Sequence, residues 1–142
     1  MGKLNIEIIY KMLEDIHKNI NELEEIIKRP YSELSTIEKF GIRYIVMSLV
    51  ESSSGICIHI LNNVFNVYPK GYPTCFVLLA EKNVISHELG NALANAARLR
   101  NILVHRYWEV DDEQVYQSAR DGIRDFKRFA EIIYEVTKQW SK

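Results

Sequence analysis

The stretch of sequence that decides the fold runs from Phe40 to Val67 and reads FGIRYIVMSLVESSSGICIHILNNVFNV. Its apolar residues fall on most sides of a helix rather than along one stripe, which is typical of a helix buried on most sides. Gly41 and Gly55 are tolerated inside such a helix at about 1 kcal/mol each. The small residues 52–55 would let a neighbouring helix come close. We therefore predict a central helix against which the rest of the chain packs.

An amphipathic helix is predicted over residues 3–29, before the central one. Apolar residues recur there every three or four positions, with Lys and Glu on the other side, at Leu4, Ile8, Met12, Ile16, Ile20, Leu23 and Ile27. Pro30 ends this helix. Ser35 or Ser32 can cap the central helix that follows, and Glu38 stands at the capping-box spacing from Ser35.

Two further helices follow the central one. Residues 67–73 (VYPKGYP) are the only Pro/Gly cluster in the chain and predict a loop. A short helix is then expected from Thr74 to Lys82, with a break at Asn83. Ser86 can cap a longer helix from His87 to about Val104, which is rich in small residues.

Asp111 can cap the last helix, with Gln114 at the capping-box position. Its predicted apolar stripe consists of Val115, Ala119, Ile123 (or Gly122), Phe126, Phe129, Ile133 and Val136. No segment shows sustained period-two alternation, so we predict no strands. Long helices with short connections favour antiparallel neighbours. We therefore predict an all-α fold, an up-and-down bundle of four long helices plus one short helix, in a single domain of residues 1–142.

The composition is that of an ordinary soluble domain. Hydrophobic residues make up 47% and charged residues 26% of the chain, and the net charge is −1, so any binding of RNA requires locally clustered positive charge. Cys57 and Cys75 lie in apolar runs without metal-ligand spacing, which favours buried, reduced thiols. No signal peptide is recognised, and no apolar run approaches the ~18 to 20 residues of a membrane span. We expect a cytoplasmic protein that is not inserted in a membrane.

The densest polar cluster is Arg98–Asp111, RLRNILVHRYWEVD, at the end of the fourth predicted helix. On an ideal helix Asn101 and His105 share a face, because they are four residues apart. Arg100 and Tyr107 are seven apart and nearly aligned. Arg100 and His105 are five apart and do not share a face unless the helix end loosens.

These groups suit the cleavage of RNA without a metal ion. His105 can take the proton of a 2′-hydroxyl that attacks the adjacent phosphate, and Arg100 can stabilise the negative charge that develops. The amide of Asn101 can orient the imidazole or a phosphate oxygen. One histidine does not easily serve as both base and acid, whereas two chains sharing a cleft would supply two. The structural alternative is a histidine placed favourably at a helix C-terminus, beside aromatic side chains that only pack.

The string Arg100–Tyr107, RNILVHRY, resembles the R-x4-H-x-Y signature of the HepT family within the HEPN superfamily, including the Asn that follows the Arg. The resemblance extends over roughly residues 5–140, with the helices in the expected order. It implies a metal-independent endoribonuclease toxin that acts on tRNA or mRNA without a cofactor. It also implies a homodimer in which the motifs of both chains line one cleft.

The resemblance further implies a partner and a role for each motif residue. The partner is a minimal nucleotidyltransferase antitoxin, MntA, which transfers AMP to the motif tyrosine, here Tyr107. Arg100 becomes the group that stabilises the phosphate, His105 the acid and base, and Asn101 a supporting polar group. Arg106 adds positive charge to the cleft.

Basic residues recur at helical spacing on the last predicted helix and form a candidate RNA-binding ridge of Arg120, Arg124, Lys127 and Arg128. Arg98 and Arg106 are candidates to extend it. The alternative is a solvated helix face whose charge is compensated by Asp121, Asp125 and Glu131.

Among the remaining histidines, His59 in an apolar stretch and His87 in a first helical turn favour structural roles. His17 lies on a charged face, where we expect it to be exposed to solvent. Glu51, in the central helix, could face the cleft. Neither a metal-binding motif nor a nucleotide-binding motif is present. The rival function is a non-catalytic helical subunit that binds nucleotide or a nucleotidyltransferase, for which a degenerate motif is expected, whereas Arg100, His105 and Tyr107 are intact.

Overall fold

The computed structural model describes residues 4–141, and over that range the chain is helical without any strand. The long helices are α1 (Ile6–Ile27), α2 (Thr36–Val64), α4 (His87–His105) and α5 (Asp112–Trp140), and the short one is α3 (Tyr72–Glu81). Two single 3-10 turns, η1 (Tyr31–Glu33) and η2 (Tyr107–Glu109), lie in the connections. The prediction of an all-α fold with four long helices and one short helix is confirmed.

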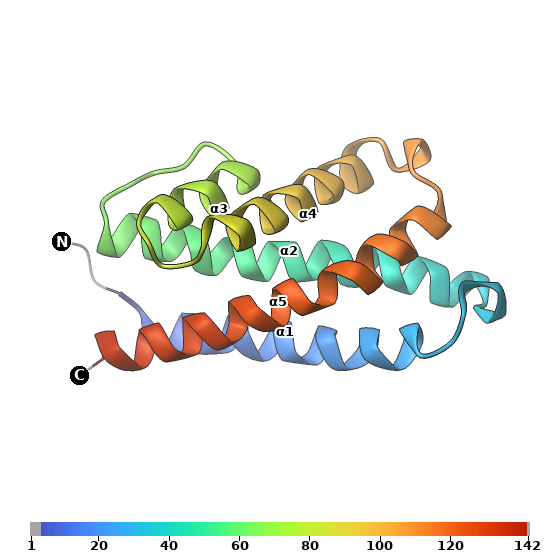
Figure 1. Cartoon of the computed structure of the whole chain (residues 1–142), viewed down its shortest axis with the longest axis horizontal. Helices are drawn as coiled ribbons and strands as arrows, with labels where there is room; N and C mark the ends of the chain where they lie inside the picture. Colours follow the sequence, from blue (N-terminus) through green and yellow to red (C-terminus); the bar gives the residue numbers. More distant parts are fainter. Residues whose placement is uncertain (1–3, 142) are drawn as a thin grey trace.

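The long helices alternate in direction along the long axis of the molecule (Figure 1). α1 starts near the end where both termini lie, α2 returns, α4 runs out again and α5 comes back. α2 contacts each of the other four α-helices, while α3 packs mainly on α4. Because of this order, the α1–α2 connection and the α4–α5 connection meet at the same end of the bundle (Figure 1).

α2 is the core helix, as its sequence predicted. It buries eleven side chains, and Ile56, Cys57, Ile60 and Leu61 are fully inaccessible. Among the helices of residues 4–141, α2 alone is long and apolar enough to pass as a membrane span, contrary to our expectation that no run comes near that length. More than half of the qualifying window is buried inside the bundle, as in the core helix of a soluble protein.

The predicted caps are confirmed in detail. Ser35 and Asp111 each form a capping box, with Glu38 and Gln114 respectively, and Ser86 accepts a hydrogen bond from the backbone N–H of Leu89. Each cap satisfies backbone donors that have no partner within the helix. These side chains therefore fix where α2, α4 and α5 begin.

Three details of the predicted pattern are wrong. The buried stripe of α1 passes through Ile9 and Leu13, and Ile8 is exposed, because the stripe is rotated by one residue in the first two turns. α3 begins at Tyr72 rather than Thr74, since a proline is compatible with the first helical turn. Near the end of α5, Thr137 is buried in place of Val136, and its hydroxyl donates to the carbonyl of Ile133 at 2.8 Å.

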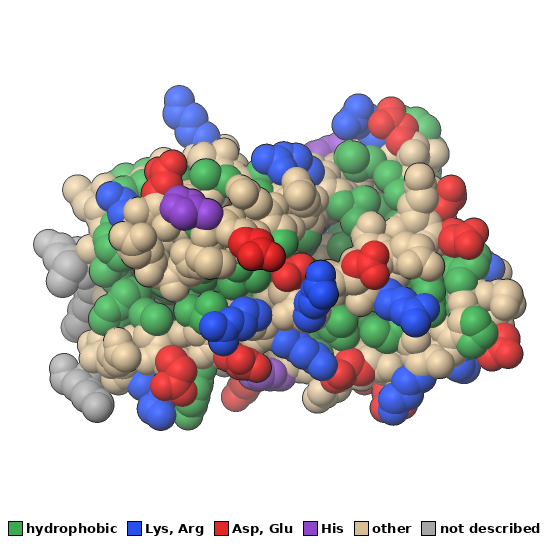
Figure 2. Space-filling model, in the orientation of Figure 1, with side chains coloured by type: hydrophobic (Ala, Val, Ile, Leu, Met, Phe, Trp, Pro, Cys, Tyr) green, Lys and Arg blue, Asp and Glu red, His purple; other side chains and the backbone are tan. Residues whose placement is uncertain are grey.

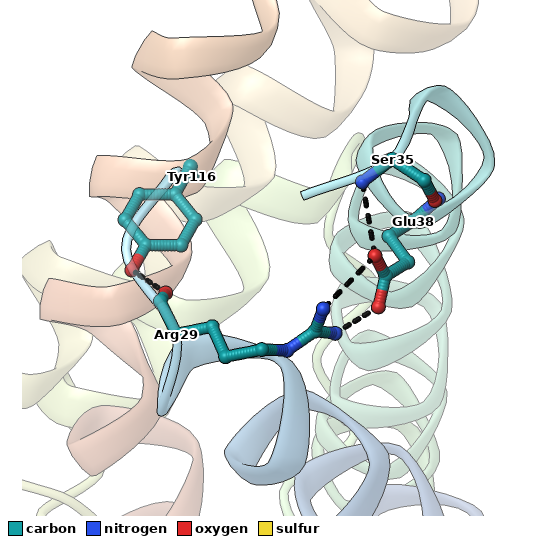
Figure 3. Close-up of polar contacts among 4 residues, drawn as sticks. All are labelled: Arg29, Ser35, Glu38 and Tyr116. Atoms are coloured by element: carbon teal, nitrogen blue, oxygen red, sulfur yellow. Dashed lines mark hydrogen bonds and ion pairs between the residues drawn. The ribbon is translucent and has the colours of Figure 1, made fainter. Parts of the chain in front are cut away.

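The α1–α2 corner is closed by polar contacts from three segments (Figure 3). The hydroxyl of Tyr116 in α5 donates to the backbone carbonyl of Arg29 at 2.7 Å. The guanidinium of Arg29 donates to both carboxylate oxygens of Glu38, which also accepts from the backbone N–H of Ser35. The hydrogen bonds from Arg29, followed by the one from Ser35, lower the pKa of Glu38 to about 2.

Candidate active site

The predicted motif lies where α4 stops. Helical geometry persists through His105 and ends at Arg106, whose backbone (φ −145°, ψ 50°) leaves the helix while its N–H still donates to the carbonyl of Ile102 at 2.7 Å. Tyr107 and Trp108 follow in η2. The motif therefore divides between the last turns of α4 and the connection to α5.

Arg43 of α2 fastens this connection. Its Nε donates to the carboxylate of Asp112 at 2.6 Å, Nη1 to the carbonyl of Tyr107 at 3.1 Å and Nη2 to the carbonyl of Val110 at 2.6 Å. The planar guanidinium can satisfy three acceptors at once because its donors form a rigid fork. One side chain thus ties η2 and the first turn of α5 to the core helix.

Arg100 is surrounded by groups from three helices. Nη2 donates to Oε1 of Glu51 in α2 at 2.6 Å, and Nη1 donates to Oδ1 of Asn101 at 3.1 Å. The guanidinium carbon lies 5.0 Å from the centre of the Tyr72 ring, at the start of α3. Its side chain is only 16% exposed, and Nε is buried without a hydrogen-bond partner among residues 4–141.

His105 and Arg100 do not share a face of α4. Five residues of regular helix place them about 140° apart around the axis, and the helix does not loosen before His105. Arg100 points to α2 and α3, whereas His105 is exposed. The expected alignment of Arg100 with Tyr107 is wrong, because Tyr107 lies beyond the helix end.

Asn101 contacts Arg100 rather than His105 in the described part of the chain. Its Oδ1 accepts from the guanidinium, so the amide helps to fix the orientation of Arg100. The supporting polar role expected for Asn101 thus has a geometric basis, although its partner is the guanidinium instead of the imidazole.

Tyr107 and Trp108 project into solvent, at 63% and 69% exposure, with their rings in edge-to-face contact at 5.4 Å. Beside them lies a depression of about 540 Å³, whose floor includes Phe40, Met47 and Leu103. Most of Tyr107 is therefore accessible from solvent.

The basic candidates are all exposed, and half of them form ion pairs with acids. On α5, Lys127 bonds to Glu24 at 2.5 Å and Arg128 lies 3.6 Å from Glu131. Arg124 borders a groove of about 390 Å³ between α4 and α5, with Asp121 and Asp125 beside it. Figure 2 shows this face with blue and red side chains interspersed rather than a continuous positive surface.

Near the motif, Arg98 donates to Asn95 at 2.5 Å and Arg106 lies 3.3 Å from Glu109. Like the α5 pairs, these contacts leave much of each side chain in solvent. Carboxylates thus compensate Arg106, Lys127 and Arg128, whereas Arg98 contacts a neutral amide.

The other three histidines and the two cysteines lie outside the motif. His59 accepts a hydrogen bond from the backbone N–H of Asn5 at 2.9 Å, and burial lowers the pKa of His59. His17 and His87 are exposed. Cys57 and Cys75 are buried free thiols, as expected, and burial raises the pKa of Cys57.

Sequence reasoning missed Arg43 and Tyr72 and left Glu51 undecided. The sequence could have pointed to Arg43 and Glu51, because they are the sole basic residue (Lys or Arg) and the sole acid between Phe40 and Val67. A charge in a buried helix requires a partner. Tyr72 carried no such signal, because its contact with Arg100 depends on how α3 packs against α4.

The family pattern described as Ribonuclease HepT-like matches residues 16–133, which is most of the chain and includes the whole motif. The chain belongs to the HepT-like family. This HepT-like protein is also 26% identical over 132 residues to the mRNA nuclease HepT of Shewanella oneidensis, covering 89% of this chain and 96% of the relative.

Solved structures agree on the fold. The cytosolic protein YutE from Bacillus subtilis, of unknown function, superposes with a TM-score of 0.85 at 16% identity, covering 98% of this chain and 94% of YutE. A tri-AMPylated HEPN toxin of Shewanella oneidensis, solved in complex with an MNT antitoxin, superposes with a TM-score of 0.78 at 24% identity, covering 90% of this chain and 97% of the toxin. The HepT-like fold thus extends over nearly the whole chain.

Proposed function

We propose that this HepT-like protein is an endoribonuclease toxin that cleaves tRNA or mRNA without a metal ion, using Arg100 and His105 with Asn101 in support. The observation that carries the proposal is the intact motif at the end of α4, with a nearly buried guanidinium and an exposed imidazole. The similarity to an mRNA nuclease over 89% of the chain supports the reaction class.

The chemical step removes one proton from the attacking oxygen and donates one proton to the leaving oxygen. The 2′-oxygen attacks the adjacent phosphorus as its proton passes to a His105 imidazole, and the bond from phosphorus to the 5′-oxygen breaks. The departing 5′-oxygen takes a proton from a second His105, which is protonated beforehand. Arg100 stabilises the charge on the phosphorane oxygens. The products carry a 2′,3′-cyclic phosphate and a 5′-hydroxyl.

The working form is a homodimer whose two motifs share one cleft. Arg100 and His105 point in different directions from α4, so one chain alone does not direct both at one phosphate. A face of α2 beside the motif exposes Ile37 (81%), Phe40 (59%) and Tyr44 (66%). Apolar side chains gathered on one helix face are suited to an interface between copies.

The partner is an MntA-like nucleotidyltransferase antitoxin that transfers AMP from ATP to Tyr107 and releases pyrophosphate. The exposed Tyr107 hydroxyl is free to attack the α-phosphorus, and the bulk and negative charge of AMP would then obstruct the cleft. The tri-AMPylated relative solved with its antitoxin supports this modification. Replacement of Tyr107 by Phe should abolish incorporation of AMP, measured by intact mass.

RNA reaches the cleft along exposed cations, with Arg98 and Arg106 nearest and Arg120, Arg124, Lys127 and Arg128 farther along. The ion pairs of Arg106, Lys127 and Arg128 lower the local positive potential, so phosphate is attracted less strongly there than by free cations. We place the protein in the cytoplasm, where RNA is present and where its structural relative YutE is found.

The test is incubation of the protein with total tRNA and a long mRNA in EDTA, beside Arg100→Ala and His105→Ala. Mass spectrometry first establishes that Tyr107 carries no AMP. We expect the parent to cleave and both variants to fail while retaining the helical circular dichroism spectrum. Absence of cleavage by the unmodified parent would favour the rival function, a non-catalytic partner of a nucleotidyltransferase.

A further inference from the structure

The Glu51 carboxylate next to Arg100 requires an explanation, because an anion is out of place where a phosphate should bind. Glu51 is half exposed, whereas Arg100 is nearly buried. It is not needed to keep Arg100 charged, since a guanidinium is protonated at any working pH. An exposed ion pair also adds little to stability. The remaining role for Glu51 is to fix the orientation of the Arg100 guanidinium.

The contacts around Arg100 define such an effect. Glu51 accepts from Nη2, Asn101 accepts from Nη1, and the Tyr72 ring lies against the guanidinium. These three groups come from α2, α4 and α3. A planar group held at two edges and one face has little freedom to rotate.

The contacts also determine which donors are left. A guanidinium has five N–H groups. Glu51 and Asn101 take one each, and the Nε–H is buried without a partner. One N–H on each terminal nitrogen therefore remains for a phosphate, which must approach the guanidinium end-on rather than along the Nε side.

We propose that Glu51 is a positioning residue, which holds the Arg100 guanidinium against Tyr72 so that its two terminal nitrogens meet the scissile phosphate. This inference rests on the proposed ribonuclease function. Glu51 neither touches the substrate nor transfers a proton. It acts on the rate of the chemical step through Arg100.

Steady-state kinetics of Glu51→Ala and Glu51→Gln in the full chain test the proposal, with Glu25→Ala as the matched control from an exposed ion pair of α1. In Glu51→Ala we expect kcat to fall about 10- to 100-fold with KM nearly unchanged. Glu51→Gln keeps an oxygen that accepts from Nη2, so it should recover most of kcat. The pH profile should keep the shape of the parent's.

A second readout does not depend on catalysis. The Arg100 Nε–H signal in a ¹⁵N NMR spectrum should exchange slowly with water in the parent and in Glu51→Gln, and faster in Glu51→Ala. If the parent cleaves RNA but Glu51→Ala keeps the parent's kcat, or exchange is unaltered, the positioning role is wrong and the ribonuclease stands. An equal fall of kcat in Glu51→Ala and Glu51→Gln, together with a changed pH profile, would also show that Glu51 is not a positioning residue. If the parent never cleaves, the proposed function fails, and the exchange rates alone decide whether Glu51 fixes the guanidinium.

Discussion

At the scale of single residues, Arg43 and Glu51, two charged residues of the core helix, have different roles. Arg43 joins α2 to η2 and to the first turn of α5 through three hydrogen bonds. Glu51 accepts a hydrogen bond from Arg100 about two turns further along α2. One charge fixes the backbone that carries Tyr107, and the other contacts the guanidinium proposed to bind phosphate. The site is thus attached to the most buried helix at two points.

Replacement of Arg43 by Met should lower the free energy of unfolding by about 1–3 kcal/mol, because a partly buried carboxylate and two carbonyls lose their donor. Urea unfolding measures this, and hydrogen exchange should show faster opening of residues 107–110. Arg128→Met, which removes an exposed ion pair, is the control and should change stability little. Equal effects of the two substitutions would show that Arg43 does not anchor the connection.

At the scale of helices, caps and close contacts set where each element lies. The α1–α2 corner depends on Glu38, which caps α2 and pairs with Arg29 (Figure 3). The α3–α4 pair depends on Gly90, where an added Cβ would lie 2.9 Å from Ala80 Cβ and 3.0 Å from the Phe76 carbonyl. Both features can be tested by a single substitution.

The Glu38 contribution should depend on pH. Because the pKa of Glu38 is lowered to about 2 in the folded protein from an ordinary 4.5, its stabilisation is complete above pH 4.5 and is lost as pH falls towards 2. The parent should therefore melt at a higher temperature than Glu38→Gln at pH 7, and the difference should shrink below pH 4.5. Glu25→Gln, in an exposed pair, is the control. A difference in melting temperature as large at pH 2 as at pH 7 would show that the ionised Glu38 carboxylate does not provide the stabilisation.

Gly90→Ala should destabilise the bundle by about 1–3 kcal/mol, because the Phe76 backbone cannot easily move away from a new methyl group. Gly41→Ala is the matched control, since nothing lies within 4 Å of its added Cβ. It should stabilise α2 by about 0.5–1 kcal/mol through the lost flexibility of glycine. Thermal unfolding of both variants measures the two effects, and opposite signs are the expected result.

Local signals explain what the sequence predicted at this scale. The caps at Ser35, Ser86 and Asp111 and the break at Asn83, which adopts a left-handed φ of 62°, were predicted from neighbouring residues alone. The rotation of the α1 stripe was not, because adjacent Ile8 and Ile9 satisfy the same spacing. Likewise the motif was found, but its division at the end of α4 and the contacts of Arg100 depend on packing between helices.

At the scale of the whole molecule, the proposed site needs a second copy of the chain. The exposed apolar face of Ile37, Phe40 and Tyr44 lies on the helix that also supplies Arg43 and Glu51. The rigid core and the incomplete single-chain site together favour a cleft formed by association.

Sedimentation velocity should accordingly find a dimer for the parent. Tyr44→Lys should shift it to monomer without loss of helicity, because two charges would be buried in a symmetric interface. Tyr68→Lys is the matched control, since Tyr68 is equally exposed but lies in the loop before α3. A monomeric parent, or dimers in both variants, would place the interface elsewhere or exclude it.

The central claim is that the RNA's own 2′-hydroxyl is the nucleophile, activated without a metal ion at the Arg100–His105 motif. The most direct measurement is mass spectrometry of the products from a single-stranded RNA incubated with the unmodified protein in EDTA, beside the same strand with 2′-deoxy nucleotides at the mapped cleavage sites. We expect 2′,3′-cyclic phosphate and 5′-hydroxyl ends, with the substituted strand left intact at those sites. Products ending in 3′-hydroxyl and 5′-phosphate, or cutting of the substituted strand there, would contradict it.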